Sequence, residues 1–138
     1  MNDRRQFLKN SLLASAGLAL APLSGATAGS MDGLPQGLIY TQANPGMWGK
    51  KVGGHLPRVS VDGDKVGVFT KHGMSEKHFI VRHTIVAHNG KVLGSKTFSP
   101  EDEEARSSHT IPAEYRGQKL YATSFCNKHD MWVAEFTA

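Results

Sequence analysis

Short stretches that alternate apolar and polar residues, separated by turn-forming residues, fill the chain from residue 56 almost to its last residue. A period of two predicts strands that bury one face. Residues 56–61 and 65–70 are two such stretches, and they flank Asp62-Gly63-Asp64. This arrangement predicts a hairpin, because Asp and Gly adopt the backbone conformations that a tight turn requires.

A second hairpin is predicted around Asn89-Gly90, which lies between the β-branched stretch 78–88 and the stretch 91–98. Three further stretches complete a set of seven strands: 107–111, 119–125 and 132–136. None of the seven has a helical period. We therefore expect an all-β fold, a seven-stranded antiparallel immunoglobulin-like β-sandwich that occupies residues 53–138.

The segment before this domain has a different texture. Residues 29–52 are rich in Gly, Pro, Gln and Asn and have little periodicity, so we expect an extended lead-in with Trp48 as its anchor. Residues 1–28 read as a signal peptide: Arg4-Arg5 precedes an apolar run at 11–23 and the small residues Ala26-Thr27-Ala28. They predict export to the periplasm by the twin-arginine route, with cleavage after residue 28.

The apolar run in this signal is too short to span a bilayer comfortably, and Gly17 and Pro22 interrupt it, so no membrane span is expected once the signal is removed. The formal net charge of +4 includes three basic residues of the signal. The remaining chain is nearly balanced in charge and gives no case for nucleic-acid binding. Its single cysteine, Cys126, cannot form an intrachain disulfide, which leaves pairing between chains or metal binding.

Candidate chemistry centres on Cys126-Asn127-Lys128-His129. A lone pair of this kind is also consistent with a buried free cysteine beside an unrelated surface histidine. The other histidines strengthen the metal interpretation, because His55, His72 and His78 also fall at predicted strand ends or in loops, and a sandwich gathers such positions on one rim. Three histidines fall within strands or at their far ends and are interpreted as ordinary, partly exposed residues: His83, His88 and His109.

The order and spacing of these residues between Trp48 and Phe136 resemble the iron-binding domain of the desulfoferrodoxin and neelaredoxin family, the superoxide reductases. No run of four cysteines precedes them, so the resemblance is to the one-iron type. It implies a mononuclear iron (Fe2+/Fe3+) with five protein ligands: His55, His72, His78, His129 and the axial thiolate of Cys126. Five ligands exceed the four that zinc usually takes, and a mixed imidazole and thiolate set suits iron.

The resemblance also implies an activity, the one-electron reduction of superoxide to hydrogen peroxide with electrons from an unidentified redox protein. The chain departs from the family at two places. Gly53-Gly54 replaces a Glu-Lys pair that many relatives carry before the first histidine, and Asp130 replaces the usual glycine after the last. Lysines elsewhere are then candidates to attract the superoxide anion: Lys50, Lys51, Lys71, Lys77 and Lys128.

Two other interpretations stay open at this point. One is a cupredoxin-like electron-transfer module that binds copper through a Cys, His and Met cluster, for which Met131 is available. The other is a sandwich with a purely structural or sulfur-carrier role and no metal. The sequence does not identify the electron donor, and it leaves homo-oligomer formation open.

Overall fold

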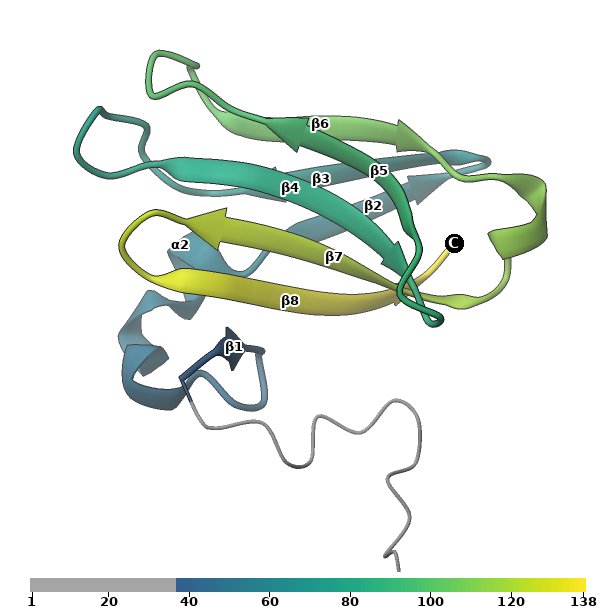
Figure 1. The fold of residues 1–138 in the computed structure, drawn as a ribbon, viewed down its shortest axis with the longest axis horizontal. Helices are drawn as coiled ribbons and strands as arrows, with labels where there is room; N and C mark the ends of the chain where they lie inside the picture. Colours follow the sequence, from purple (N-terminus) through teal and green to yellow (C-terminus); the bar gives the residue numbers. More distant parts are fainter. Residues whose placement is uncertain (1–36) are drawn as a thin grey trace, which may run out of the picture. The chain divides into compact units, whose positions relative to one another are not determined.

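Two β-sheets pack face to face and carry the predicted alternation of buried and exposed residues (Figure 1). The computed structural model describes residues 37–138, so the predicted signal peptide lies outside the described part. The five-stranded sheet has the order β1 (Ile39–Tyr40), β8 (Asp130–Thr137), β7 (Lys119–Cys126), β4 (Ile80–Ala87) and β5 (Val92–Thr97). The three-stranded sheet has the order β2 (Arg58–Asp62), β3 (Lys65–Thr70) and β6 (Ala105–Thr110).

Both predicted hairpins are present. The β2–β3 hairpin closes on the pair Asp62 and Lys65, and Gly63 has a φ of 59° in its turn. The β4–β5 hairpin turns at Gly90, where φ is 85°, and a bulge lies between Ile85 and Val86. A positive φ is readily adopted by glycine because it has no Cβ. The turn residues therefore set the register of four of the strands.

The all-β prediction is confirmed, but its strand number is wrong. The described residues form eight strands, and the additional one, β1, pairs in parallel with β8 and not antiparallel. It lies in the predicted lead-in and is only two residues long, too short to show a period. A tertiary contact holds it in place, because the buried Tyr40 packs against Trp132 with ring centroids 5.2 Å apart.

The predicted lead-in also contains helical turns. The 3-10 helix η1 (Gly46–Lys51) leads directly into α2 (Val52–His55), and a second 3-10 helix, η2 (Ala113–Tyr115), follows β6. His55 therefore ends a helix, whereas the sequence pattern placed it at the start of a strand. The next residue, Leu56, is extended with ψ at 124°, as expected of a residue that precedes a proline. None of the helices in residues 37–138 is long and apolar enough to cross a membrane.

The space between the sheets is filled by two apolar clusters and a polar layer. The first cluster is formed by Val66, Val68, Ile85, Ala87, Ile111, Tyr115, Leu120 and Ala122. The second is formed by Ile80, Phe98, Ala105 and Cys126. Between them, on β3, β4, β6 and β7, lie buried polar residues, which we call the polar layer: Thr70, His83, Ser107, His109 and Ser124.

The polar layer corrects one sequence interpretation. His83 is 0% exposed and His109 is 8% exposed, so neither is the partly exposed residue that its place in a strand suggested. Only His88, in the β4–β5 turn, is exposed as expected. The alternation of β4 and β6 places both buried histidines on the inner face, where polar groups need hydrogen-bond partners.

His83 makes the stability of the metal-free protein depend on pH. Burial, and then the charges of His109 and Lys96, lower its pKa from 6.5 to about 4. As the pH falls from 6.5 towards 4, the unfolded chain takes up a proton at this residue and the folded protein does not. The free energy of unfolding should therefore decrease over this range, by up to about 3 kcal/mol from His83 alone.

Urea unfolding of the metal-free protein at neutral pH and near pH 4 measures this decrease, with His83→Gln as the comparison. Glutamine does not titrate, so the variant should lose less stability on acidification than the wild type. Equal losses in the two proteins would show that His83 is protonated alike in the folded and unfolded states.

Candidate metal centre

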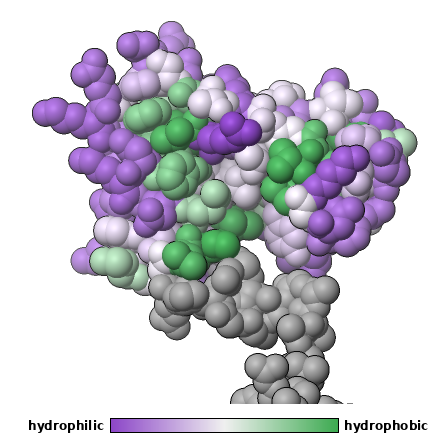
Figure 2. All heavy atoms as spheres, in the orientation of Figure 1, coloured by the Kyte–Doolittle hydropathy of each residue, from purple (hydrophilic) through white to green (hydrophobic). Residues whose placement is uncertain are grey.

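The five residues predicted as ligands lie together at one end of the sandwich. His55, His72, His78, Cys126 and His129 each present one donor atom, and these atoms all lie within 4.8 Å of one another. The residues come from four places: the end of α2, the loop between β3 and β4, the end of β7 and the β7–β8 turn. In Figure 1 these segments share the left-hand end of the molecule, where the surface in Figure 2 is mostly polar.

Asn127 joins two of these segments. Its Oδ1 accepts a hydrogen bond from the backbone N of Phe79 (3.0 Å), and its Nδ2 donates to the carbonyl of Lys77 (3.2 Å). Its own backbone N donates to the carbonyl of Phe79 (3.2 Å). These bonds fix the residues on both sides of His78 to the turn that carries Cys126 and His129. Sequence patterns do not predict this role of Asn127, because the partners of its side chain are about 50 residues away.

The histidine nitrogens are close enough to share one metal ion. Nε2 of His78 lies 3.1 Å from Nε2 of His72 and 3.0 Å from Nδ1 of His129, which in turn lies 2.9 Å from Nε2 of His55. Two ligand atoms bonded at about 2.1 Å to one metal, at right angles, are separated by about 3.0 Å. The observed spacings match this value.

Hydrogen bonds alone do not satisfy this arrangement. Nε2 of His78 and Nδ1 of His129 each face two other ring nitrogens. A ring nitrogen carries either one proton or one lone pair, so it makes one good hydrogen bond and not two. A cation at the centre would interact with all of the lone pairs at once. The donor set therefore fits a metal ion better than it fits a hydrogen-bonded cluster.

Backbone carbonyls orient two of the rings. Nδ1 of His55 donates to the carbonyl of Lys51 (2.9 Å), and Nδ1 of His72 donates to the carbonyl of Gly73. Each bond places the proton on Nδ1 and leaves the lone pair of Nε2 directed at the centre, an arrangement common in metal-binding histidines. His129 differs, because it presents Nδ1 to the cluster.

All four histidines have a lowered pKa, and burial is the largest cause for each. The pKa of His55 falls to about 4, because burial outweighs the opposing hydrogen bond to Lys51. At neutral pH the rings are therefore uncharged, which is the protonation state that binds a metal ion.

Cys126 is fully buried at the inner side of the cluster. Its Sγ lies 3.6 Å from Nδ1 of His129 and accepts a hydrogen bond from the backbone N of Lys128 (3.5 Å). Its other neighbours are apolar, Ile80, Phe98 and Ala105 among them. His72 and His78 are only partly buried. The cluster thus has one apolar side, at the sulfur, and one side open to solvent.

Two tryptophans pack against the same histidines. The indole N of the buried Trp132 donates to the carbonyl of His129 (2.9 Å), and its ring lies 5.6 Å from that of His55. The ring of Trp48 meets His129 edge-on at 4.6 Å. Its Nε1 is the one buried side-chain N or O atom in residues 37–138 without a hydrogen-bond partner. Trp48 therefore anchors η1 to the centre through ring contact.

The two departures from the family pattern lie beside this centre. Gly53 has open space where a Cβ would be, and a Cβ on Gly54 would lie 3.4 Å from the carbonyl of Lys71. Asp130 has a φ of 59°, the one positive value among the non-glycine residues at 37–138. Glycine adopts this conformation at no steric cost, and aspartate is among the residues that tolerate it. Asp130 therefore adopts at this turn a backbone conformation that glycine would adopt more readily.

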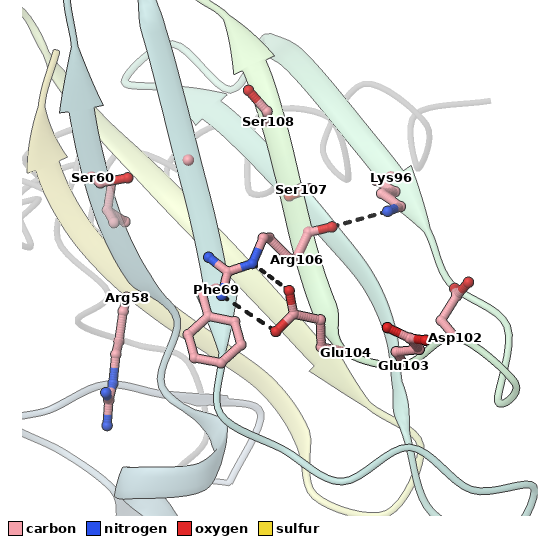
Figure 3. Close-up of a pocket in the computed structure, with 12 residues that line it drawn as sticks. Arg58, Ser60, Phe69, Lys96, Asp102, Glu103, Glu104, Arg106, Ser107 and Ser108 are labelled. Carbon is pink, nitrogen blue, oxygen red and sulfur yellow. Dashed lines mark hydrogen bonds and ion pairs between the residues drawn. The ribbon is translucent and has the colours of Figure 1, made fainter.

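A separate polar hollow lies on the outer face of β2, β3 and β6, and none of the five predicted ligands lines it (Figure 3). Arg106 stacks on the ring of Phe69 at 4.3 Å and pairs with Glu104 at 2.5 Å. In the adjoining loop, Asp102 accepts a hydrogen bond from the backbone N of Ser99 (2.8 Å). These charged side chains interact with residues close by in the sequence, so the acidic loop at 101–104 stabilises its own conformation.

A cluster of four neutral imidazoles and one buried thiol in a β-sandwich defines a mononuclear metal protein with mixed nitrogen and sulfur ligands. The model of the Desulfoferrodoxin family matches residues 50–135, most of the described part. The chain belongs to the desulfoferrodoxin family, as the resemblance in the sequence implied. No curated protein matches the chain.

Solved structures of superoxide reductases share this fold. A single-residue variant of the superoxide reductase (neelaredoxin) from Ignicoccus hospitalis is 25% identical, with a TM-score of 0.59 over 72% of this chain and 91% of that one. The one-iron superoxide reductase from Giardia intestinalis is 22% identical, with a TM-score of 0.56 over 61% of this chain and 97% of that one. The second likeness concerns the fold alone.

Proposed function

We propose that this protein is a superoxide reductase that converts superoxide to hydrogen peroxide at a mononuclear iron centre. The ligands are His55, His72, His78, Cys126 and His129. The observation that carries the proposal is the convergence of these five donor atoms, with the spacing that a single metal ion requires, in a member of the desulfoferrodoxin family. Iron bound by these residues would supply the one electron that, with two protons from solvent, converts superoxide to hydrogen peroxide, and an external redox protein would return that electron.

Residues of the centre bind the metal, orient the rings and leave one side open to solvent. The neutral imidazoles bind the metal without a proton having to leave, and the carbonyls of Lys51 and Gly73 hold two of the rings in the required orientation. The backbone N of Lys128 donates a hydrogen bond to the sulfur of Cys126 and helps to hold that side chain in place. The partly exposed His72 and His78 mark the side from which superoxide and protons arrive.

In the copper interpretation Met131 would be a metal ligand, but it does not point to the histidine cluster. Successive residues of a strand point to opposite faces. On β8 the buried Trp132 faces the histidine cluster, and its neighbour Met131 therefore points to the other face. The copper interpretation also leaves His72 and His78 without a role, whereas both lie in the cluster.

The activity is tested by mixing the ferrous protein with superoxide in a stopped-flow or pulse-radiolysis experiment. We expect one hydrogen peroxide for each superoxide consumed and each iron oxidised, with no oxygen evolved in this half-reaction. Sustained oxygen evolution without a reductant would instead indicate a dismutase. Cys126→Ser should lose the thiolate-to-iron absorption of the oxidised protein, and His88→Ala, a change in an exposed turn, should keep it. A serine variant that retains this band would exclude Cys126 as a ligand.

Electrostatic attraction of superoxide is assigned to Lys51, with a further contribution from Lys128. Burial is the main cause of the lowered pKa of His72, His78 and His129, and the charge of Lys51 lowers each pKa further. Lys128 has the same effect on His78 and His129. Both ammonium groups therefore raise the potential at the centre, in place of the lysine that Gly54 does not supply.

Lys51→Gln should lower the second-order rate constant with superoxide about two- to fivefold at low ionic strength and flatten its dependence on salt. Lys91→Gln is the matched control, because Lys91 lies beside the β4–β5 turn at the opposite end of β4 and contacts the ring of Tyr115. Equal effects of the two substitutions would contradict a local role for Lys51.

The proposal extends to the place of action. The twin-arginine pattern at Arg4-Arg5 supports export of the folded protein to the periplasm. Changing both residues to lysine should leave the protein in the cytoplasmic fraction of its host, whereas the parent appears in the periplasmic fraction. Unchanged export of the double variant would overturn this assignment.

A further inference from the structure

The polar layer between the two apolar clusters forms one connected chain of hydrogen bonds. Oγ1 of Thr70 donates to Oγ of Ser124 (2.9 Å), and Nε2 of His83 lies 2.9 Å from the same Oγ1. On the other side of the imidazole, Nδ1 of His83 lies 2.9 Å from Oγ of Ser107, which also contacts Nε2 of His109 (2.9 Å). Every side chain of the layer has a partner, as burial of polar groups requires.

The bonds assign a direction to the protons. The hydroxyl proton of Thr70 is used towards Ser124, so Nε2 of His83 must be the donor to Thr70. Nδ1 of His83 is then the acceptor for the hydroxyl of Ser107. His83 is therefore neutral with its proton on Nε2, and its two bonds join residues of the opposite sheet.

These bonds connect the two sheets, whose strands within residues 37–138 are not paired with each other. Thr70 and Ser107 belong to the three-stranded sheet, and His83 and Ser124 belong to the five-stranded one. The bonds Thr70–Ser124, Thr70–His83 and His83–Ser107 each cross the interior. Apolar packing also joins the sheets, but hydrogen bonds add a preferred length and direction.

These hydrogen bonds between the sheets lie directly behind two of the predicted ligands. Thr70 ends β3, and its carbonyl accepts a hydrogen bond from the backbone N of His72 (2.8 Å). Ser124 precedes Cys126 by two residues on the same buried face of β7 and pairs in register with His83 on β4. One hydrogen bond thus links the strand that leads to His72 with the strand that carries Cys126.

We propose that Thr70, His83 and Ser124 are positioning residues for the metal centre, which they serve by fixing the ends of β3 and β7 so that His72 and Cys126 reach the same ion. This role rests on the proposed function, because it concerns the metal ligands assigned there. It explains why polar residues occupy inner-face positions of β3, β4 and β7 that apolar side chains would otherwise fill. Side chains that support metal ligands typically change metal affinity about 10- to 100-fold when removed.

The test compares three single variants of the iron-loaded protein. Thr70→Val keeps the size of the side chain but removes both hydrogen bonds and leaves the Nε2 proton of His83 without an acceptor. Thr70→Ser restores the hydroxyl. Thr84→Val is the matched control. Thr84 forms a hydrogen bond to Thr123 between β4 and β7, the strands that carry His83 and Ser124, but this bond lies within one sheet.

The measured quantities are the rate of iron loss to a chelator and the energy of the thiolate-to-iron absorption band. For Thr70→Val we expect iron loss about tenfold or more faster and a shifted band. Thr70→Ser and Thr84→Val should resemble the wild type. In the metal-free wild type, nitrogen NMR of the imidazole should find the proton of His83 on Nε2. A proton on Nδ1 would contradict the assigned chain of bonds.

Two outcomes would overturn the positioning role while leaving the proposed function intact: iron loss and band of Thr70→Val equal to those of the wild type, or the same change in Thr84→Val. A wild-type protein that binds no iron would contradict the proposed function itself. If Thr70→Val does not fold, Ser124→Ala removes the same cross-sheet bond from the other strand with a smaller change. It should also accelerate iron loss, and wild-type behaviour would again overturn the role.

Discussion

The structure depends on one constraint: four uncharged imidazoles and a thiol must converge within 4.8 Å, where hydrogen bonding cannot satisfy them all. Burial lowers the pKa of each histidine, so the cluster is kept neutral and ready for a cation. Without a central ion, two of the ring nitrogens each face two other ring nitrogens and can form a good hydrogen bond to only one of them. A bound metal resolves this conflict, and the free energy of binding then also stabilises the folded protein.

The β-sandwich meets this constraint by dividing the predicted ligands among separate segments and fixing those segments to one another. Cys126 ends β7 and His129 lies in the β7–β8 turn, Asn127 joins this turn to the segment around His78, and Trp132 holds the carbonyl of His129. His55 arrives from α2, which directly follows η1, and Trp48 of η1 packs against His129. The polar layer adds hydrogen bonds between the sheets just behind the centre. Positioning is thus distributed over contacts far apart in the sequence.

Much of this was predictable from local patterns. Alternation and turn residues located seven strands, and β3 matches its predicted range at both ends. The spacing of His72, His78, Cys126 and His129 indicated the cluster. What the sequence could not show depends on tertiary contact: β1 is too short for a period, and α2 contains two glycines that disfavour a helix. The burial of His83 and the partners of Asn127 likewise depend on residues far along the chain. A histidine within a strand gives no signal that distinguishes a hydrogen-bonded core residue from an exposed one.

We propose that these five residues together hold a single iron. The most direct measurement is anomalous scattering at the iron absorption edge from a crystal of the protein isolated with its native metal. We expect one peak per chain, within bonding distance of Nε2 of His55, His72 and His78, Nδ1 of His129 and Sγ of Cys126. A peak elsewhere, a peak bonded to the histidines but not to Cys126, or a different metal at this position would contradict it.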